Sequence, residues 1–92
     1  MVKIQLIGPL KEQVGLEEIE YNHQGTIREI LEIFINDYKD KIKKFIDPNT
    51  GFLLKYVMII VNRTNVIFLK DKLDTYLKMD DKIILALPVG GG

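Results

Sequence analysis

A single amphipathic helix, predicted between two groups of strands, is the feature that most limits the fold. Thr26 followed by Glu29 has the spacing of a capping box, in which each side chain accepts the other residue's backbone N–H. The apolar residues that follow recur every three or four positions and share one helix face: Ile27, Ile30, Leu31, Phe34, Ile35 and Tyr38. A helix with one apolar face has to lie against a sheet.

Apolar runs, several of them alternating with polar residues, predict strands on both sides of this helix. The predicted strands are residues 2–6, 16–22, 56–61, 66–68 and 82–87. The segments between them predict turns at 47–51, 62–65 and 78–81 and a short turn or helical segment at 71–77. The compact arrangement is a mixed sheet with parallel first and last strands and the helix across one face. We therefore predict an α+β protein with the β-grasp fold, the architecture of ubiquitin.

Length and composition narrow the class of protein further. Ninety-two residues make one domain, and 13 basic and 13 acidic residues give no net charge that would favour nucleic acid as a partner. The sequence contains no cysteine and therefore no disulfide or cysteine metal site. It also shows no signal-peptide pattern and no apolar run of the ~20 residues that a membrane span needs. We expect a soluble cytoplasmic protein that binds neither membrane nor nucleic acid.

The last residues of the chain differ from the rest. We expect a β-grasp domain over residues 1–87 and a flexible tail over residues 88–92, made of Pro88, Val89, Gly90, Gly91 and Gly92. Three glycines destabilise regular structure, but they make a segment narrow enough to enter a channel in another protein. Five extended residues reach roughly 17 Å. The tail therefore indicates that the functional group is the α-carboxylate of Gly92.

Several motifs in the C-terminal third carry a resemblance to a known family. They are Val57–Asn62, Asn65-Val66, Leu73-Asp74-Thr75 with Leu77, Asp80-Asp81, and Pro88-Val89 before Gly91-Gly92. Together they resemble the MoaD/ThiS-like sulfur carriers, which include the small subunit of molybdopterin synthase, the thiazole sulfur carrier and the ubiquitin-like modifiers of archaea. Arg63 stands where this family usually has glycine, so we expect a change in turn geometry there.

The resemblance implies a function built on Gly92. An E1-like adenylyltransferase of the MoeB/ThiF type would spend ATP to adenylate the carboxylate, and sulfur would then replace the adenylate to give a thiocarboxylate. In molybdenum or tungsten cofactor biosynthesis this sulfur goes to a pterin precursor held by the synthase large subunit, of the MoaE type. ATP and the pterin are thus bound by partners, and this chain binds no cofactor itself. The alternatives are a modifier conjugated to target-protein lysines and a sulfur carrier for thiamine thiazole or tRNA thiolation. A third alternative is a plain β-grasp binding module.

A docking surface for these partners is expected on the open face of the sheet. By the family alignment, Val57, Ile59, Val61, Ile83 and Leu85 face the core. The alternate residues Met58, Ile60, Ile84 and Ala86 would then form an exposed apolar patch beside the tail, and such patches usually mark interaction sites. The other possibility is that loop residues such as Phe52 or Leu53 fold over this face.

The remaining candidates have structural interpretations. His23 is the only histidine, and the sequence contains no serine or cysteine, so neither a metal site nor a nucleophilic dyad is expected. Asp80 and Asp81 are adjacent in a turn, and we interpret them as turn residues. The lysines at 39, 41, 43 and 44 fit a solvated helix end. We therefore expect a protein with no catalytic groups of its own.

Overall fold

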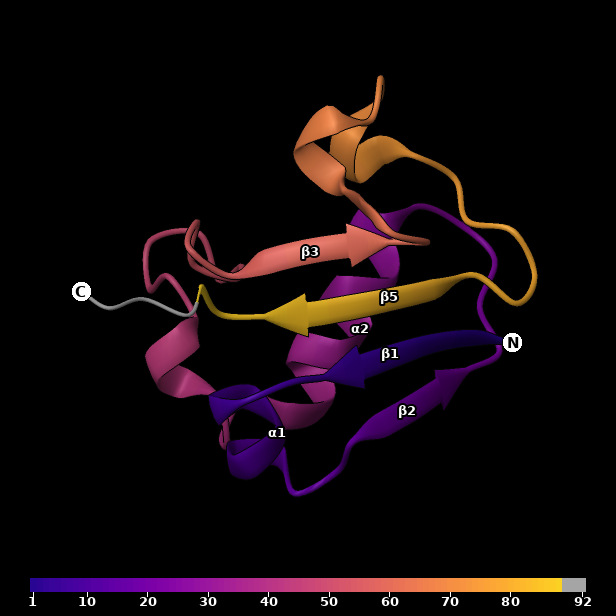
Figure 1. The fold of residues 1–92 in the computed structure, drawn as a ribbon. Coiled ribbons are helices and arrows are strands. Elements are labelled where there is room, and N and C mark those ends of the chain that lie inside the picture. Colours follow the sequence, from indigo (N-terminus) through magenta and orange to yellow (C-terminus); the bar gives the residue numbers. More distant parts are fainter. Residues whose placement is uncertain (89–92) are drawn as a thin grey trace.

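The structure, a computed structural model, describes residues 1–88 and contains one mixed five-stranded sheet in the order β2-β1-β5-β3-β4 (Figure 1). The strands are β1 (Val2–Leu6), β2 (Glu18–Tyr21), β3 (Met58–Val61), β4 (Thr64–Asn65) and β5 (Lys82–Ala86). β1 and β5 pair in parallel at the centre, and the other pairings are antiparallel. The predicted β-grasp topology, with parallel first and last strands, is confirmed.

The helix α2 (Ile27–Tyr38) crosses one face of the sheet and begins where the capping box predicts. The N–H of Glu29 donates to Thr26 Oγ1 at 3.2 Å, and the N–H of Thr26 donates to Glu29 Oε1 at 2.8 Å. These two bonds satisfy backbone donors that the first turn of a helix leaves without partners.

The core lies between α2 and the inward face of the sheet. Five of the six predicted helix residues are buried, and Tyr38 packs at the border of the core. The strands and the residue just before β3 contribute Val2, Ile4, Leu6, Val57, Ile59, Val61, Ile83 and Leu85 to the core. The predicted core residues of this part of the sheet, Val57, Ile59, Val61, Ile83 and Leu85, are therefore confirmed, whereas Ala86, predicted on the exposed face, is buried.

A short helix between β1 and β2 was not predicted from the sequence. α1 spans Pro9–Val14 and buries Leu10 and Val14 one turn apart. Proline at the first position has a φ suited to a helix, and Gly15 ends the helix in the left-handed conformation with φ 84°. The sequence carried both end signals, but six residues are too few to show a helical period.

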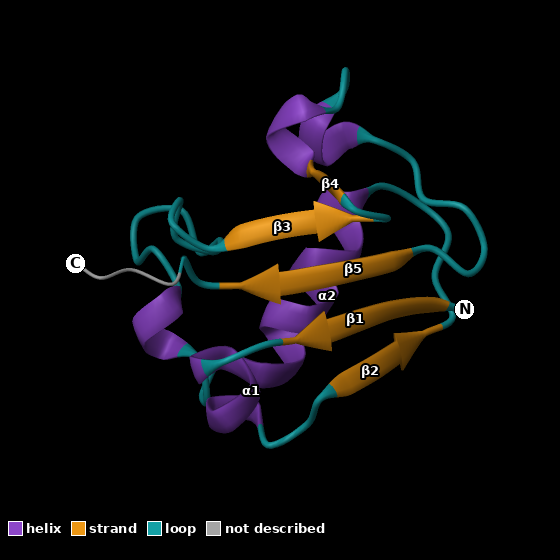
Figure 2. Ribbon diagram, viewed as in Figure 1, coloured by secondary structure: helices purple, strands orange, loops and turns teal. Residues whose placement is uncertain are grey.

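The predicted returning strand over residues 66–68 is wrong. β4 covers only Thr64–Asn65, and Val66–Phe68 form a 3-10 helix, η2, which Figure 2 shows following directly on β4. The side chain of Asn65 accepts the N–H of Ile67 at 3.1 Å and so bends the chain away from the sheet. Phe68 is 78% exposed, because the bend removes it from any strand face.

The other connections follow the predicted turns. Gly51, with φ 73°, donates its N–H to the Asp47 carbonyl at 2.8 Å in the connection between the 3-10 helix η1 (Lys43–Phe45) and β3. Residues 71–77 contain the 3-10 helix η3 (Lys72–Asp74). In the last turn Asp81 accepts the N–H of Lys78 at 2.7 Å and the Asn62 amide at 2.8 Å. The interpretation of Asp81 as a turn residue is confirmed.

We predict that Arg63→Gly stabilises the protein by about 0.5–1 kcal/mol. Arg63 has φ 75° and follows Asn62 with φ 47° in the two-residue turn between β3 and β4. A left-handed conformation costs a residue with a Cβ about 1–2 kcal/mol, part of which glycine loses again through backbone entropy. Urea unfolding measures the gain, and Arg63→Ala, which keeps the Cβ, is the control. An equal gain in the alanine variant would show that backbone strain is not the cause.

We also predict that the capping box makes stability depend on pH. The backbone N–H and the hydroxyl of Thr26 lower the pKa of Glu29 below its ordinary value. Ionised Glu29 therefore contributes stability above the unfolded-state pKa, and that contribution is lost as pH falls through the lower folded-state pKa. The stability difference between wild type and Glu29→Gln should shrink between about pH 6 and about pH 3. Glu32→Gln, further along the same helix, is the control, and equal pH dependence in both variants would contradict the prediction.

Candidate functional site

The last strand carries the candidate site and lies in the middle of the sheet. β5 pairs with β1 on one side and with β3 on the other (Figure 1). Its last residue, Ala86, is opposite Met58, the first residue of β3. Leu87 still packs against the core and Pro88 is exposed. The predictions for Val89, Gly90, Gly91 and Gly92 fall outside the described residues and stay predictions.

Proline explains why the pairing does not continue along β5. Pro88 has no backbone N–H, so it cannot donate to a neighbouring strand. β3 also supplies no residue before Met58 to the ladder. The chain therefore leaves the sheet after Leu87, from a strand that is held on both sides.

Four apolar side chains share the open face of the sheet near this point. Met58 lies opposite Ala86, and Ile60 lies opposite Ile84. We call these four residues the apolar face. Met58, Ile60 and Ile84 are partly exposed, but Ala86 is only 7% exposed and offers little surface. None of the four belongs to the core cluster under α2.

Phe52 and Leu53, in the loop between α2 and β3, do not cover the apolar face. Leu53 is buried in the core cluster and Phe52 packs against that cluster. Ile46 forms a bridge with Leu53, which holds this loop on the helix side of the sheet. The alternative that Phe52 and Leu53 cover the apolar face is therefore wrong.

Charged residues occupy the other half of the open face. Lys3 Nζ lies 3.9 Å from Glu18 and 4.0 Å from Glu20, and Lys82 Nζ lies 4.0 Å from Glu18. Each of these side chains is well exposed, so each pair contributes at most about 1 kcal/mol. The open face thus has a charged part on β1, β2 and the first residue of β5, and an apolar part on the rest of β5 and on β3.

The titratable side chains of residues 1–88 are the remaining candidates for a chemical site. Within this range no three His, Cys, Asp or Glu side chains are grouped closely enough to hold a metal ion. His23 is half-buried, and its enclosed Nε2 has no hydrogen-bond partner among the described residues. The Tyr21 hydroxyl donates to Asp37 at 2.9 Å, and burial together with this carboxylate raises the pKa of Tyr21.

Every helix among residues 1–88 is too short or too polar to serve as a membrane span.

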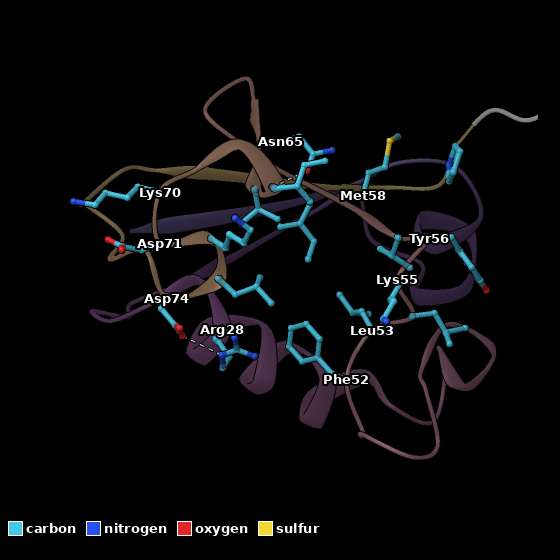
Figure 3. A pocket seen from close by; sticks show the side chains of 18 residues that line it. Arg28, Phe52, Leu53, Lys55, Tyr56, Met58, Asn65, Lys70, Asp71 and Asp74 are labelled. Carbon is cyan, nitrogen blue, oxygen red and sulfur yellow. Dashed lines mark hydrogen bonds and ion pairs between the residues drawn. The ribbon is translucent and has the colours of Figure 1, made fainter.

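The sequence analysis missed one feature, a groove of about 940 Å³ beside β3 and η2 (Figure 3). Its lining comes from five separate parts of the sequence, among them Phe52–Ile59 and Asn65–Ile67. Such a surface exists only after folding. The one local indication was the apolar run after Asn65, which the sequence analysis assigned to a strand.

Comparisons with known proteins agree with this fold. A protein-family model described as the ThiS family matches residues 4–92. Small archaeal modifier protein 1 from Methanosarcina acetivorans is similar with a TM-score of 0.83 and 25% identity, over 99% of this chain and 95% of that one. A chain in the crystal structure of the Amycolatopsis orientalis BexX/CysO complex has a TM-score of 0.76 and 19% identity, over 100% of both chains.

A third solved structure extends the comparison to proteins named for molybdopterin. It is the putative molybdopterin converting factor, subunit 1, from Pyrococcus furiosus, with a TM-score of 0.67 and 24% identity over 96% of this chain and 97% of that one. A search of curated protein sequences gave no significant match. The fold is thus that of the ubiquitin-like sulfur carriers and modifiers, and the resemblance stated from the sequence is confirmed.

We predict that Ile84→Asp weakens binding to the expected activating enzyme while the protein stays folded. Ile84 is a partly exposed member of the apolar face, so a carboxylate there remains hydrated but removes apolar contact. Binding should weaken about tenfold or more if this side chain lies at the centre of the interface. Calorimetric titration measures the affinity, and circular dichroism checks the fold.

The neighbouring residue provides the matched control. Ile83 is 0% exposed in the core, so Ile83→Asp buries an unpaired charge and should unfold the protein. An unfolded Ile84→Asp beside a folded Ile83→Asp would mean that the faces are reversed. A folded Ile84→Asp with unchanged affinity would remove the apolar face from the interface.

Proposed function

The chain belongs to the ThiS family, and on that premise we propose that it is a sulfur carrier, the small subunit of a molybdopterin synthase, acting through the carboxylate of Gly92. An E1-like adenylyltransferase of the MoeB/ThiF type joins this carboxylate to AMP and releases pyrophosphate from ATP. A hydrosulfide-level sulfur nucleophile from a donor then attacks the acyl carbonyl, the bond to AMP breaks, and a C-terminal thiocarboxylate remains. Because activation consumes ATP, we place the reaction in the cytoplasm.

One observation carries this proposal: the family match extends to Gly92 and coincides with a β-grasp fold. The residues that precede the C-terminal segment also suit the role of a sulfur carrier. β5 is paired with β1 as far as Leu85 and with β3 as far as Ala86, and the exposed Pro88 lies two residues further on. A rigid base of this kind supports the presentation of a narrow segment to another protein.

The sulfur acceptor in this proposal is a pterin precursor bound by the synthase large subunit, of the MoaE type. The thiocarboxylate sulfur attacks a carbon of the pterin precursor, and a C–S bond forms as the carbon–oxygen bond at that position breaks and its oxygen leaves with a proton. Water then cleaves the bond between sulfur and the Gly92 carbonyl, which regenerates the carboxylate and leaves the sulfur on the pterin. The similarity to the putative molybdopterin converting factor subunit supports this acceptor. The apolar face, beside the point where the chain leaves β5, is the surface we assign to docking.

A second candidate function is protein modification. The most similar of the three structures, at 25% identity, is named a small archaeal modifier protein. In this reading the activated carbonyl of Gly92 is attacked by the amine of a target lysine, which gives an isopeptide bond and releases AMP. Sulfur carriage toward thiazole or tRNA uses the same thiocarboxylate with another acceptor, and the family name supports the thiazole case.

Mass spectrometry of protein purified from its own cells tests the proposal. Replacement of one terminal oxygen by sulfur in the intact protein supports sulfur carriage. Digests that contain Gly92 joined to a lysine side chain, without any thiocarboxylate, favour the modifier. If neither species is found in cells that are making the cofactor, the result would contradict both sulfur carriage and protein modification.

We predict that deletion of Gly91 and Gly92 abolishes activity and leaves the free energy of unfolding within about 0.5 kcal/mol of wild type. The reason is that the core cluster of residues 1–88 already joins α2 to the sheet, and Leu87 is the last described residue packed against it. Urea unfolding measures stability, and sulfur transfer to the precursor with purified partners measures activity. A large loss of stability would contradict the separation of domain and tail, and retained activity would exclude Gly92 as the reactive residue.

A further inference from the structure

The groove beside β3 is a second candidate binding surface, distinct from the chemistry at Gly92. In Figure 3, Met58 and Asn65 lie along one side and Phe52 and Leu53 along the other. Lys70, Asp71 and Asp74 stand at one end of the groove and Tyr56 at the other. Pro88 also belongs to the lining. A segment bound in the groove therefore lies next to the last described residue of the chain.

One side of this groove is a stretch of strand edge without a strand partner. β4 pairs only with Ile60 and Val61 before η2 turns the chain away. Within the described residues, Met58 and Ile59 are paired with β5 alone. Backbone groups of successive residues in an antiparallel pair point to alternate sides. Because the N–H of Asn62 donates to Lys82 of β5 at 3.1 Å, the backbone of Ile59 points the other way, toward the groove.

The side chains of the groove suit an apolar occupant. Ile67 is 59% exposed, although it is a large apolar residue. Phe52 and Leu73 are half-buried, with part of their surface packed on the core. An apolar strand laid against β3 would cover these surfaces with the side chains of its inward face. The groove thus combines a backbone edge with apolar pockets, the two elements of recognition by strand addition.

The charges around the groove favour an acidic occupant. Four basic residues line it, against two acidic ones: Arg28, Lys55, Lys70 and Lys72 against Asp71 and Asp74. Arg28 Nε is paired with Asp74 at 3.2 Å, so the excess of two positive charges lies with the lysines. The chain as a whole has no net charge, which makes this excess local to the groove. Complementary charge of this kind favours one class of partner over others.

We propose that the groove binds an extended segment of a partner protein, apolar at alternate positions and flanked by acidic residues, which adds a strand to β3 at Ile59. A second copy of the chain fits less well, because two such grooves would bring their lysines together. Residues 89–92 fit less well too, since Val89 is their only large apolar side chain. This binding is independent of the proposed function: loss of one leaves the other measurable.

The test uses the full chain, labelled with ¹⁵N, and the synthetic peptide acetyl-Glu-Val-Thr-Val-Thr-Leu-Glu-amide. The expected result is saturable change in the NMR signals of the amides of Ile59 and Ile67, while those of β2 stay unchanged. N-methylation of each of two adjacent central peptide residues in turn tests strand addition. Only alternate N–H groups of an added strand face β3, so one methylation should weaken binding about tenfold and the other far less.

Two exposed isoleucines provide matched protein variants. Ile67→Asp removes an apolar groove residue and adds a negative charge, so binding should weaken about tenfold or more. Ile33, 39% exposed on α2 and not part of the groove, gives the control Ile33→Asp with unchanged affinity. A peptide with lysine in place of both glutamates should also bind more weakly, and the difference should shrink as salt is added.

Four results would overturn the proposal. The first is the absence of saturable changes at Ile59 and Ile67 up to about 1 mM peptide, a concentration that detects even weak binding. The second is equal binding of the lysine-flanked peptide. The third is a concentration-dependent dimer that Ile67→Asp dissolves, which would assign the groove to a second copy. The fourth is nuclear Overhauser contact between Val89 and Ile67 in the free protein, which would assign it to the chain's own terminal segment.

Discussion

Burial of the α2 stripe against the central parallel pair β1–β5 is the interaction on which the structure depends. Ile30 and Phe34 of the helix and Ile4, Ile83 and Leu85 of the sheet are all removed from solvent. The sequence contains no cysteine, so no disulfide adds to the stability of this small core. A domain of this length buries only about 60–65% of the surface that its unfolded chain exposes, and the contacts of α2 therefore carry much of the net stability.

This packing also decides where the functional end of the chain begins. Because β5 is the middle strand of the sheet, it is hydrogen-bonded to a strand on each side, and its core-facing side chains pack in the same cluster as those of α2. Pairing stops where β3 begins at Met58, and Pro88 prevents its extension. In the proposed function this rigid strand presents Gly92 to partner enzymes. The apolar face on the outside of β5 and β3 then becomes a docking surface for the same structural reason, since alternate residues of two core strands must face outward.

The parts of the fold that the sequence predicted are those set by regular patterns. The capping box located the start of α2, its apolar period located the buried face, and alternation on β1 separated the two faces of that strand. On β3 and β5, where both faces are apolar, the family resemblance assigned the core residues. The parts that were missed depend on one local bond or on distant segments. The bond from Ile67 N–H to the Asn65 side chain turned an apolar run into η2, and α1 was too short to show a period. The groove joins stretches far apart in sequence, so no local pattern indicated it.

The central claim is that a stable domain presents the carboxylate of Gly92 for activation by another protein. The most direct measurement compares the native chain with a semisynthetic chain whose Gly92 ends in an amide, each mixed with ATP and an adenylyltransferase of the MoeB/ThiF type. The account predicts pyrophosphate release with the native chain and none above background with the amide, although both unfold at the same urea concentration. Equal pyrophosphate release from the two chains would contradict it.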